Sequence, residues 1–207
     1  MPYTFSMLQL VAFASRPLKR EEVYHAVLYS EFQHDTVSLI DVTQDDMDRF
    51  IVNCSRGLAE TSRGMYPTVQ LIHESVRNYS LDSGLKVVAV APRDSYAAWC
   101  QENLKILCLG YVKNCALELL KLPVDGQKEH LSDHFMNVIE LQRQTNTTHP
   151  FLDYALDGMI THAQSAHCAG HLQHSYMEMF PLDTWIRLYN LLVASHHSRL
   201  SQRATLT

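Results

Sequence analysis

Apolar residues recur at helical spacing through the first third of the chain. Three segments, 3–14, 20–31 and about 44–56, place apolar side chains three and four positions apart, which predicts three short amphipathic helices. The side chains expected to be buried in the second helix are Val23, Ala26 and Val27, and those in the third are Met47, Phe50, Ile51 and Cys54.

The third helix carries signals at both ends. Thr43 is a suitable N-cap, and Asp46 stands three residues later, where a capping box places its second member. Gly57 stands where a C′ residue is expected, because glycine adopts the left-handed conformation of that position without strain. The sequence therefore predicts a helix that begins after Thr43 and ends before Gly57.

Two short strand patterns follow this helix. Residues 58–62 and 68–72 flank a segment that contains Gly64 and Pro67, which predicts a β-hairpin. A further strand is possible at 37–42. Three helices followed by a hairpin is the order of elements in a winged helix, so we expect a winged-helix domain over residues 1–82.

The remainder of the chain is predicted to be helical, so the fold class is mainly α. Residues 82–94 resemble a connection, and Ser95 can cap the helix that follows it. Pro150 is suited to the first position of a later helix. We expect a multi-helix domain over 94–198 and a flexible tail over 199–207. The predicted helical segments after the one at Ser95 are 113–121, 128–143, 150–163, 170–180 and 183–197.

Composition narrows the class of protein. The 207 residues are 46% hydrophobic and 19% charged, as in a globular domain. The formal net charge of −5 argues against a nucleic-acid partner, since phosphate binding requires a basic face. No apolar run approaches the length of a membrane helix, and no secretory signal is visible. Five cysteines without a CxxC pair indicate reduced thiols, so we expect a cytoplasmic protein without a membrane partner.

Histidines are concentrated in one segment of the second half. On a continuous helix, imidazoles at such spacing can hold zinc. Gly170 suggests a turn within the segment, however, and no acidic ligand lies beside it, so we expect no metal site. His130 and His134 are four residues apart and are interpreted as part of a solvated helix face. The candidate ligands in the segment are His162, His167, Cys168, His171 and His174.

No nucleophile pattern stands out. Cys54 and Cys108 lie on apolar stripes, and Cys100 is next to Trp99, which favours packing roles for all three thiols. Ser75 is too close to His73 in sequence to be expected on a triad face. The chain also lacks GxSxG, GxGxxG and GxxxxGK[ST] motifs, so we expect a protein that is not an enzyme and has no cofactor of its own.

His73 and Glu74 stand where the second hairpin strand meets a predicted helix. The residues alone favour a buried histidine that bonds a backbone carbonyl, with Ile72 and Val76 anchoring the corner in the core. The alternative is an imidazole that donates a hydrogen bond to a phosphate oxygen, with Glu74 fixing its tautomer or beginning the helix.

Four parts of the chain resemble the region that follows the NACHT ATPase module in fungal STAND signalling proteins, NLR-like receptors that often carry ankyrin repeats. The match of Val69-Gln-Leu-Ile-His-Glu-Ser-Val-Arg77 to the family's VQFIHESVRDFL is nearly residue for residue. The other resembling segments are Leu8–Leu18 with Glu21–Ala26 (RPL and EELY-type motifs), Asn53–Glu60, and Pro150–Ala155 with Thr161–Ala163 (a PFLxYA…HA motif).

This resemblance implies a regulatory role in signal transduction. In the family the corresponding histidine contacts the β-phosphate of ADP, so His73 and Glu74 would sense nucleotide (ADP or ATP) when an ATPase module is present in cis or in trans. An ankyrin-repeat or other sensor region is a further implied partner. The chain departs from the family at Asn78-Tyr79-Ser80 and has no P-loop or ankyrin repeats, so we expect a fragment or a truncated paralogue.

Two other functions stay open at this point. A DNA-binding winged helix would read bases with about residues 44–56, although Asp45, Asp46 and Asp48 there outnumber Arg49 and Arg56. A small cysteine- or zinc-dependent hydrolase would need an activated thiol or a bound metal.

Overall fold

The computed structural model of the chain describes residues 2–32, 42–82, 96–120, 142–190 and 192. Within these ranges the protein is mainly helical, as expected, and contains a small three-stranded antiparallel sheet. No helix in the described ranges is long and apolar enough to cross a membrane. Several predicted features lie wholly or largely outside the described residues: the strand at 37–42, the connection at 82–94, the helix at 128–143 with His130 and His134, and the tail at 199–207.

Three helices form the N-terminal part, as the apolar spacing predicts. They are α1 (Pro2–Phe13), α2 (Arg20–Phe32) and α3 (Gln44–Cys54). The predicted buried face of α2 is confirmed, and on α3 the buried residues are Met47 and Ile51. The other two residues predicted for α3, Phe50 and Cys54, are half-buried and pack against the same core.

Both ends of α3 have defined caps. The capping box is confirmed, because Asp46 N–H donates to Thr43 Oγ1 at 3.2 Å and Thr43 N–H donates to Asp46 Oδ2 at 3.1 Å. The prediction for Gly57 is wrong by one position. Arg56, with φ 57°, occupies C′, and Gly57, with φ 76°, follows it and donates its N–H to Val52 O at 2.7 Å. This last bond closes a Schellman-type turn, which places the glycine one residue further on.

The sheet has the strand order β1-β3-β2. The predicted hairpin is confirmed as β2 (Ala59–Thr61) and β3 (Thr68–Leu71), with Ala59 opposite Leu71. On its other edge β3 pairs with β1 (Leu18–Lys19), in the register Leu18 to Val69. The sequence does not predict β1, because two residues are too few to show an alternation. Helix α4 (Glu74–Asp82) follows β3.

The second half is built around two long helices. Helix α5 (Tyr96–Leu119) joins the helix predicted after Ser95 and the segment predicted at 113–121 into one. Helix α7 (Leu152–Cys168) begins after Pro150 instead of at it, since Pro150 lies in the turn closed by Leu152 N–H and His149 O at 3.0 Å. The helix predicted at 170–180 shortens to α8 (His174–Glu178), because Gly170 adopts φ 96° and forms the expected turn. Residues 142–148 and 182–190 are also helical.

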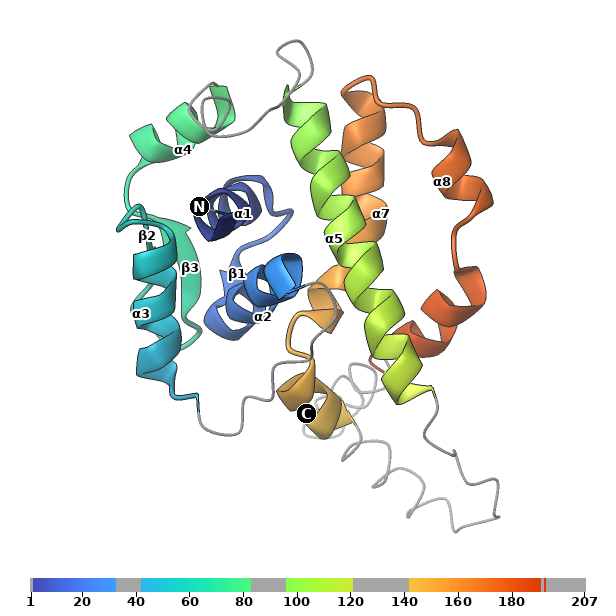
Figure 1. The fold of residues 1–207 in the computed structure, drawn as a ribbon, viewed down its shortest axis with the longest axis horizontal. Helices are drawn as coiled ribbons and strands as arrows, with labels where there is room; N and C mark the ends of the chain where they lie inside the picture. The colour runs from blue at the N-terminus through green and yellow to red at the C-terminus, as the bar shows by residue number, and fades with distance from the viewer. Residues whose placement is uncertain (1, 33–41, 83–95, 121–141, 191, 193–207) are drawn as a thin grey trace, which may run out of the picture.

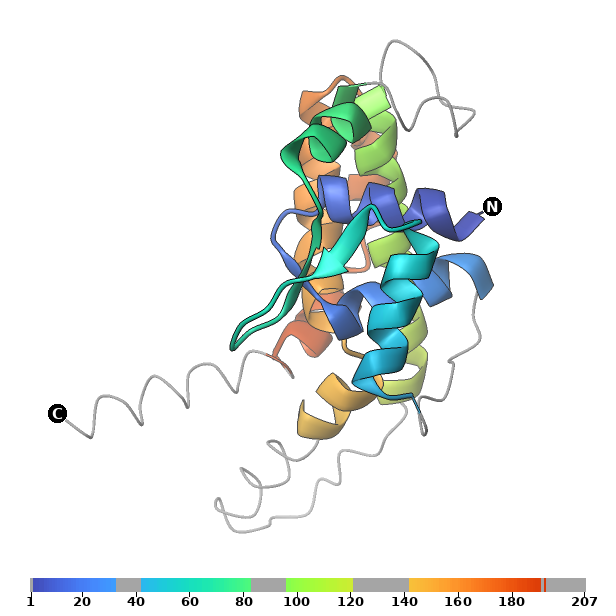
Figure 2. The ribbon, with the colours of Figure 1, turned by 90° about the vertical axis from the view of Figure 1, so that its left-hand side faces the viewer.

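The helices pack in layers. Figures 1 and 2 show α5 and α7 side by side, with α1 and α2 between this pair and a layer made of α3, the sheet and α4. Buried residues from both halves form one continuous cluster, for example Met7 and Val23 from the first and Leu104 and Leu156 from the second. The packing therefore fixes the sheet and α4 against the long helices through α1 and α2.

Gly158 marks a close approach of α7 to α5. A Cβ atom at this position would lie 2.9 Å from Cys108 Sγ on α5 and 3.1 Å from Cε1 of Tyr154. The first distance is shorter than real side-chain contacts, so the two helices reach this separation only because residue 158 has no side chain.

We expect Gly158→Ala to lower the free energy of unfolding by about 1–3 kcal/mol, because the added methyl overpacks the α5–α7 contact. In a Cys108→Ala background the same substitution should be close to neutral, since the sulfur is gone and alanine gains about 1 kcal/mol of helix propensity over glycine. Urea unfolding of wild type, Gly158→Ala, Cys108→Ala and the double variant measures the coupling free energy between the two positions. An equal effect of Gly158→Ala in both backgrounds would show that the sulfur does not set the helix separation.

Candidate functional site

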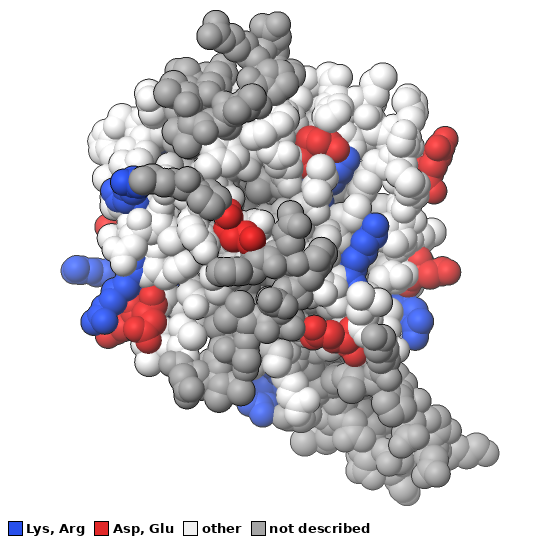
Figure 3. All heavy atoms as spheres, viewed as in Figure 1, with Lys and Arg blue, Asp and Glu red and all other residues white. Residues whose placement is uncertain are grey.

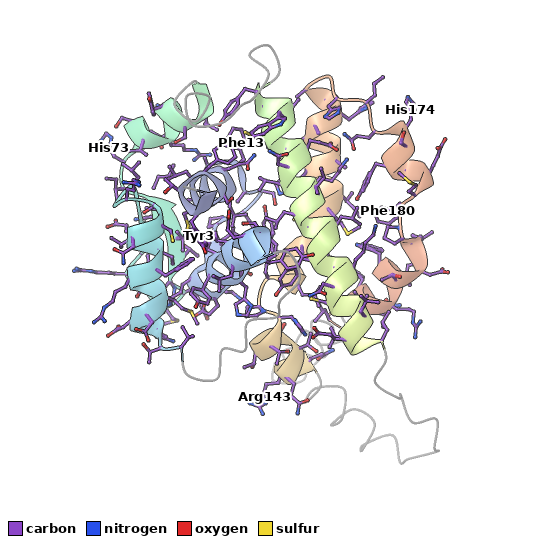
Figure 4. All side chains as sticks on the ribbon, in the orientation of Figure 1. Tyr3, Phe13, His73, Arg143, His174 and Phe180 are labelled. Atoms are coloured by element: carbon purple, nitrogen blue, oxygen red, sulfur yellow. The ribbon has the colours of Figure 1, made fainter. Side chains whose placement is uncertain are left out.

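His73 lies between the last sheet strand and α4, on the side of the molecule away from α7 (Figure 4). Strand β3 ends at Leu71, and Ile72 N–H still bonds Leu58 O at 3.1 Å. The His73 carbonyl accepts from Val76 N–H at 3.0 Å, so His73 is the residue that directly precedes the helix. The hairpin and the start of α4 therefore fix the backbone of His73 from both sides.

The imidazole of His73 caps α4. Its Nδ1 accepts a hydrogen bond from Ser75 N–H at 3.1 Å and lies 2.8 Å from Ser75 Oγ. A side-chain acceptor bound to the second helical N–H is the geometry of an N-cap. Because Nδ1 acts as an acceptor, the neutral ring carries its proton on Nε2. His73 is exposed, so this tautomer presents a hydrogen-bond donor at the surface.

Four predictions about this corner are wrong in whole or in part. His73 is exposed instead of buried against a carbonyl, and Ser75 does contact it, because His73 precedes the helix and its ring folds back over the first turn. Glu74 begins α4, as one of its two predicted roles requires. The other predicted role, fixing the tautomer of His73, belongs to Ser75 instead. Ile72 is 47% exposed, since it follows the end of the strand, and Val69 provides the buried anchor instead.

A pocket of about 430 Å³ opens beside His73. It lies between the end of α1, strands β1 and β3, and the first turn of α4. The ionisable side chains that line it are Arg16, His73, Glu74 and Arg77, and the remaining lining residues are Val11, Ala12, Ala14, Ser15, Pro17, Leu18, Thr68, Val69, Gln70 and Leu71. Hydrogen-bond donors from two segments far apart in sequence thus border one cavity.

Arg16 is already held by carboxylates. Its two terminal nitrogens bond the two oxygens of Glu22 at 3.0 and 2.9 Å, and Nη2 also lies 3.2 Å from Asp153 Oδ2. Glu22 is buried and accepts the Lys19 N–H at 2.7 Å. Most of the Arg16 charge is therefore neutralised, and His73 and Arg77 are the main hydrogen-bond donors that this chain offers to an anion in the pocket.

Next to Arg16, a chain of hydrogen bonds runs from the N-terminal half to α7 and α5. Ser15 N–H donates to the Tyr154 hydroxyl at 3.1 Å, the hydroxyl bonds His162 Nε2 at 2.8 Å, and His162 Nδ1 bonds Gln101 Oε1 at 2.5 Å. The Gln101 oxygen only accepts, so His162 carries its proton on Nδ1 and Tyr154 donates to Nε2. The Arg16 guanidinium lies 5.1 Å from the centre of the Tyr154 ring. The sequence gives no signal for this chain of hydrogen bonds, called the Tyr154 relay below, because two of its three bonds join residues that are 139 and 61 positions apart.

Burial controls the ionisation of this relay. It raises the pKa of Tyr154 to about 12 and lowers the pKa of His162 to about 4. Both groups are therefore neutral near pH 7, so His162 serves as a structural hydrogen-bond partner.

The other candidate metal ligands do not converge with His162. His167, Cys168, His171 and His174 are exposed, and His171 Nδ1 lies 3.6 Å from Glu102 Oε2. In the described ranges, no three His, Cys, Asp or Glu side chains are arranged to hold a metal ion.

The thiols proposed as packing residues lie in apolar surroundings. Cys100 and Cys108 are buried and Cys54 is half-buried, and burial raises the pKa of all three thiols. A raised pKa lowers the thiolate fraction at neutral pH, which works against nucleophilic chemistry at these positions.

Comparison of the chain with protein-family models, with curated proteins and with solved structures finds no significant match.

We expect stability to fall as the pH drops from about 6.5 to 4, and His162 and His25 to cause much of the loss. Burial lowers the pKa of His25 to about 4 as well, with His149 contributing, and no described group bonds its buried Nε2. Because the folded pKa lies below the unfolded value of 6.5, the unfolded chain binds more protons in this range. Each histidine should then remove about 1–2 kcal/mol between pH 7 and 5.

Urea unfolding at pH 7, 6 and 5 measures this dependence. His162→Gln and His25→Gln should each flatten the pH profile relative to wild type. Parallel profiles for wild type and both variants would refute the assignment of the pH dependence to these two histidines.

Proposed function

We propose that this chain is a non-catalytic regulatory segment of a STAND-type NTPase signalling protein, acting in the cytoplasm. The observation that carries the proposal is the His73 corner: Nδ1 caps α4, Nε2 carries the proton, and the ring borders a pocket with Arg77. In the proposed role, Nε2–H donates to a phosphate of ADP held by a NACHT ATPase module, supplied in cis or in trans. Glu74, the first residue of α4, is its neighbour at the nucleotide.

The order of elements supports a winged helix over residues 1–82. Helices α1, α2 and α3 are followed by the β2–β3 hairpin, and β1 between α1 and α2 adds a third strand to the sheet. In this interpretation α4 connects the winged helix to the helical domain proposed for 94–198. His73 then stands where the wing returns to a helix, at the outer edge of the module.

Contacts between the resembling segments give further support. The segment that contains Ser15 and Arg16 touches the segment that contains Asp153 and Tyr154, through the bonds at 3.1 and 3.2 Å. Two of the four regions on which the resemblance rests are thus in direct contact, although more than 130 residues separate them. We infer that they act as one unit that presents His73 in a fixed orientation.

The proposed switch is an exchange of ADP for ATP. A ligand shifts a two-state equilibrium only through contacts that differ between the states. The His73 contact to ADP would exist only in the docked, inactive state, so loss of this contact would favour release. Because Glu22 and Asp153 already bond the Arg16 guanidinium, we expect the phosphate's main ligands to come from the ATPase module.

In an assembly of this chain with its ATPase module, His73→Ala should speed the release of ADP by about tenfold or more, as expected for one lost hydrogen bond to a charged group. His73→Gln is the matched control, because its amide nitrogen can take the place of Nε2 and keep the donor. His73→Asn places its amide near Nδ1, so it should preserve the helix cap but behave like alanine at the nucleotide.

Release of a fluorescent ADP analogue measures these rates. The proposal predicts that wild type and His73→Gln release ADP slowly, whereas His73→Ala and His73→Asn release it quickly and raise signalling output. Identical release rates for all four would contradict a sensing role for His73.

The DNA-binding alternative has less support. Asp45 and Asp46 lie in the first turn of α3, and Asp48 bonds Arg20 at 2.6 Å and Thr61 at 2.6 Å. Figure 3 shows positive and negative side chains mixed on the described part of the face that it draws. Tight, salt-sensitive binding of duplex DNA by the purified chain would reverse this ranking.

A further inference from the structure

A second and larger cleft lies at the opposite side of the molecule, between α7 and the segment that contains α8. Its volume is about 760 Å³, within the range of small-molecule sites. Figure 4 labels His174 and Phe180, which come from the α8 segment and line this cleft. The full lining is Ile160, Ala163, Gln164, His167, Gln173, His174, Tyr176, Met177, Phe180 and Leu182.

Directed hydrogen bonds hold the α8 segment beside the long helices. The Tyr176 hydroxyl donates to Met159 O at 2.9 Å, and Trp185 Nε1–H donates to Leu156 O at 2.9 Å. Before α8, Gln173 bonds Lys105 Nζ at 2.7 Å and Glu102 Oε2 at 2.9 Å. These bonds flank the lining residues Met177, Phe180 and Leu182 along the chain, so the cleft has a fixed frame.

The lining combines an apolar surface with imidazoles. Aliphatic, thioether and aromatic groups make up most of it, and several are exposed to solvent, with Ile160 43% and Met177 67% exposed. Among the described lining residues there is no Asp, Glu, Lys or Arg, and the ionisable groups besides the Tyr176 phenol are His167 and His174. An anionic head group is complementary to imidazoles, which donate hydrogen bonds when neutral and carry positive charge when protonated.

We propose that this cleft binds a small amphiphile: a hydrocarbon body of medium length with one carboxylate head. The body lies against Ile160, Met177 and Phe180, and the carboxylate bonds His167 and His174. A small molecule fits better than a protein helix, because the bonds of Tyr176 and Trp185 to α7 hold the segment between these two residues beside that helix and limit the size of an occupant. The site is independent of the His73 pocket and of the function proposed for it.

Calorimetric titration of the full chain with sodium decanoate tests the site. We expect one saturable site and a dissociation constant that falls about fourfold for each methylene added between octanoate and dodecanoate, as burial of each CH₂ requires. Ile160→Trp should fill the cleft and weaken decanoate binding at least tenfold. Ile186→Trp is the matched control, since Ile186 is 41% exposed and does not line the cleft, and it should bind like wild type.

The head-group contact has its own readout. The double substitution of His167 and His174 by alanine should weaken decanoate at least fivefold and leave decanol, which lacks the carboxylate, unaffected. The proposal is overturned by an absence of saturable binding, by equal effects of the two tryptophan variants, or by a dimer that forms through the cleft and is broken by Ile160→Trp. Equal loss of decanoate and decanol in the double variant would overturn the assignment of the carboxylate to the imidazoles.

Discussion

The Tyr154 hydroxyl is the contact on which the arrangement of the two halves depends. It accepts a backbone N–H from Ser15 and donates to His162, which in turn bonds Gln101 on α5. Buried polar atoms are costly when they lack a partner, so removal of one member would leave the others unsatisfied. Beside it, Arg16 joins Glu22 of α2 to Asp153 of α7 and lies over the Tyr154 ring. These polar contacts therefore join the same two halves of the molecule that the continuous apolar core joins.

This arrangement bears directly on the candidate site. Ser15 and Arg16 line the pocket beside His73, and the same two residues contact Tyr154 of α7. A change in the position of α7 would reach the pocket through these two residues. Arg16 offers little free positive charge to the pocket, since Glu22 and Asp153 bond it. This neutralisation fits a role in which another module supplies most of the contacts to nucleotide. In the proposed function, His73 senses that nucleotide, and the Tyr154 relay fixes the segment of Ser15 and Arg16 beside His73.

The sequence predicts local structure well and long-range contacts poorly. Helical periodicity, the Thr43 capping box and the hairpin are all readable, because each depends on residues within a few positions of one another. The cap formed by His73 and Ser75 is also local, but a histidine is an unusual N-cap, so the residues alone favour a core position for His73. Glu22, Asp153 and Tyr154 lie on predicted helices, yet nothing in the pattern says that they meet Ser15 and Arg16. Such contacts follow from tertiary packing, which one sequence does not reveal.

Hydrogen exchange of Tyr154→Phe, compared with wild type by mass spectrometry, tests the central claim most directly. The substitution removes one oxygen and leaves the ring. If the hydroxyl joins the two halves, exchange should accelerate in three separate regions: residues 13–19, the middle of α7, and α5 around Gln101. Acceleration confined to α7 would contradict the claim, because it would show that the N-terminal half is held without the relay.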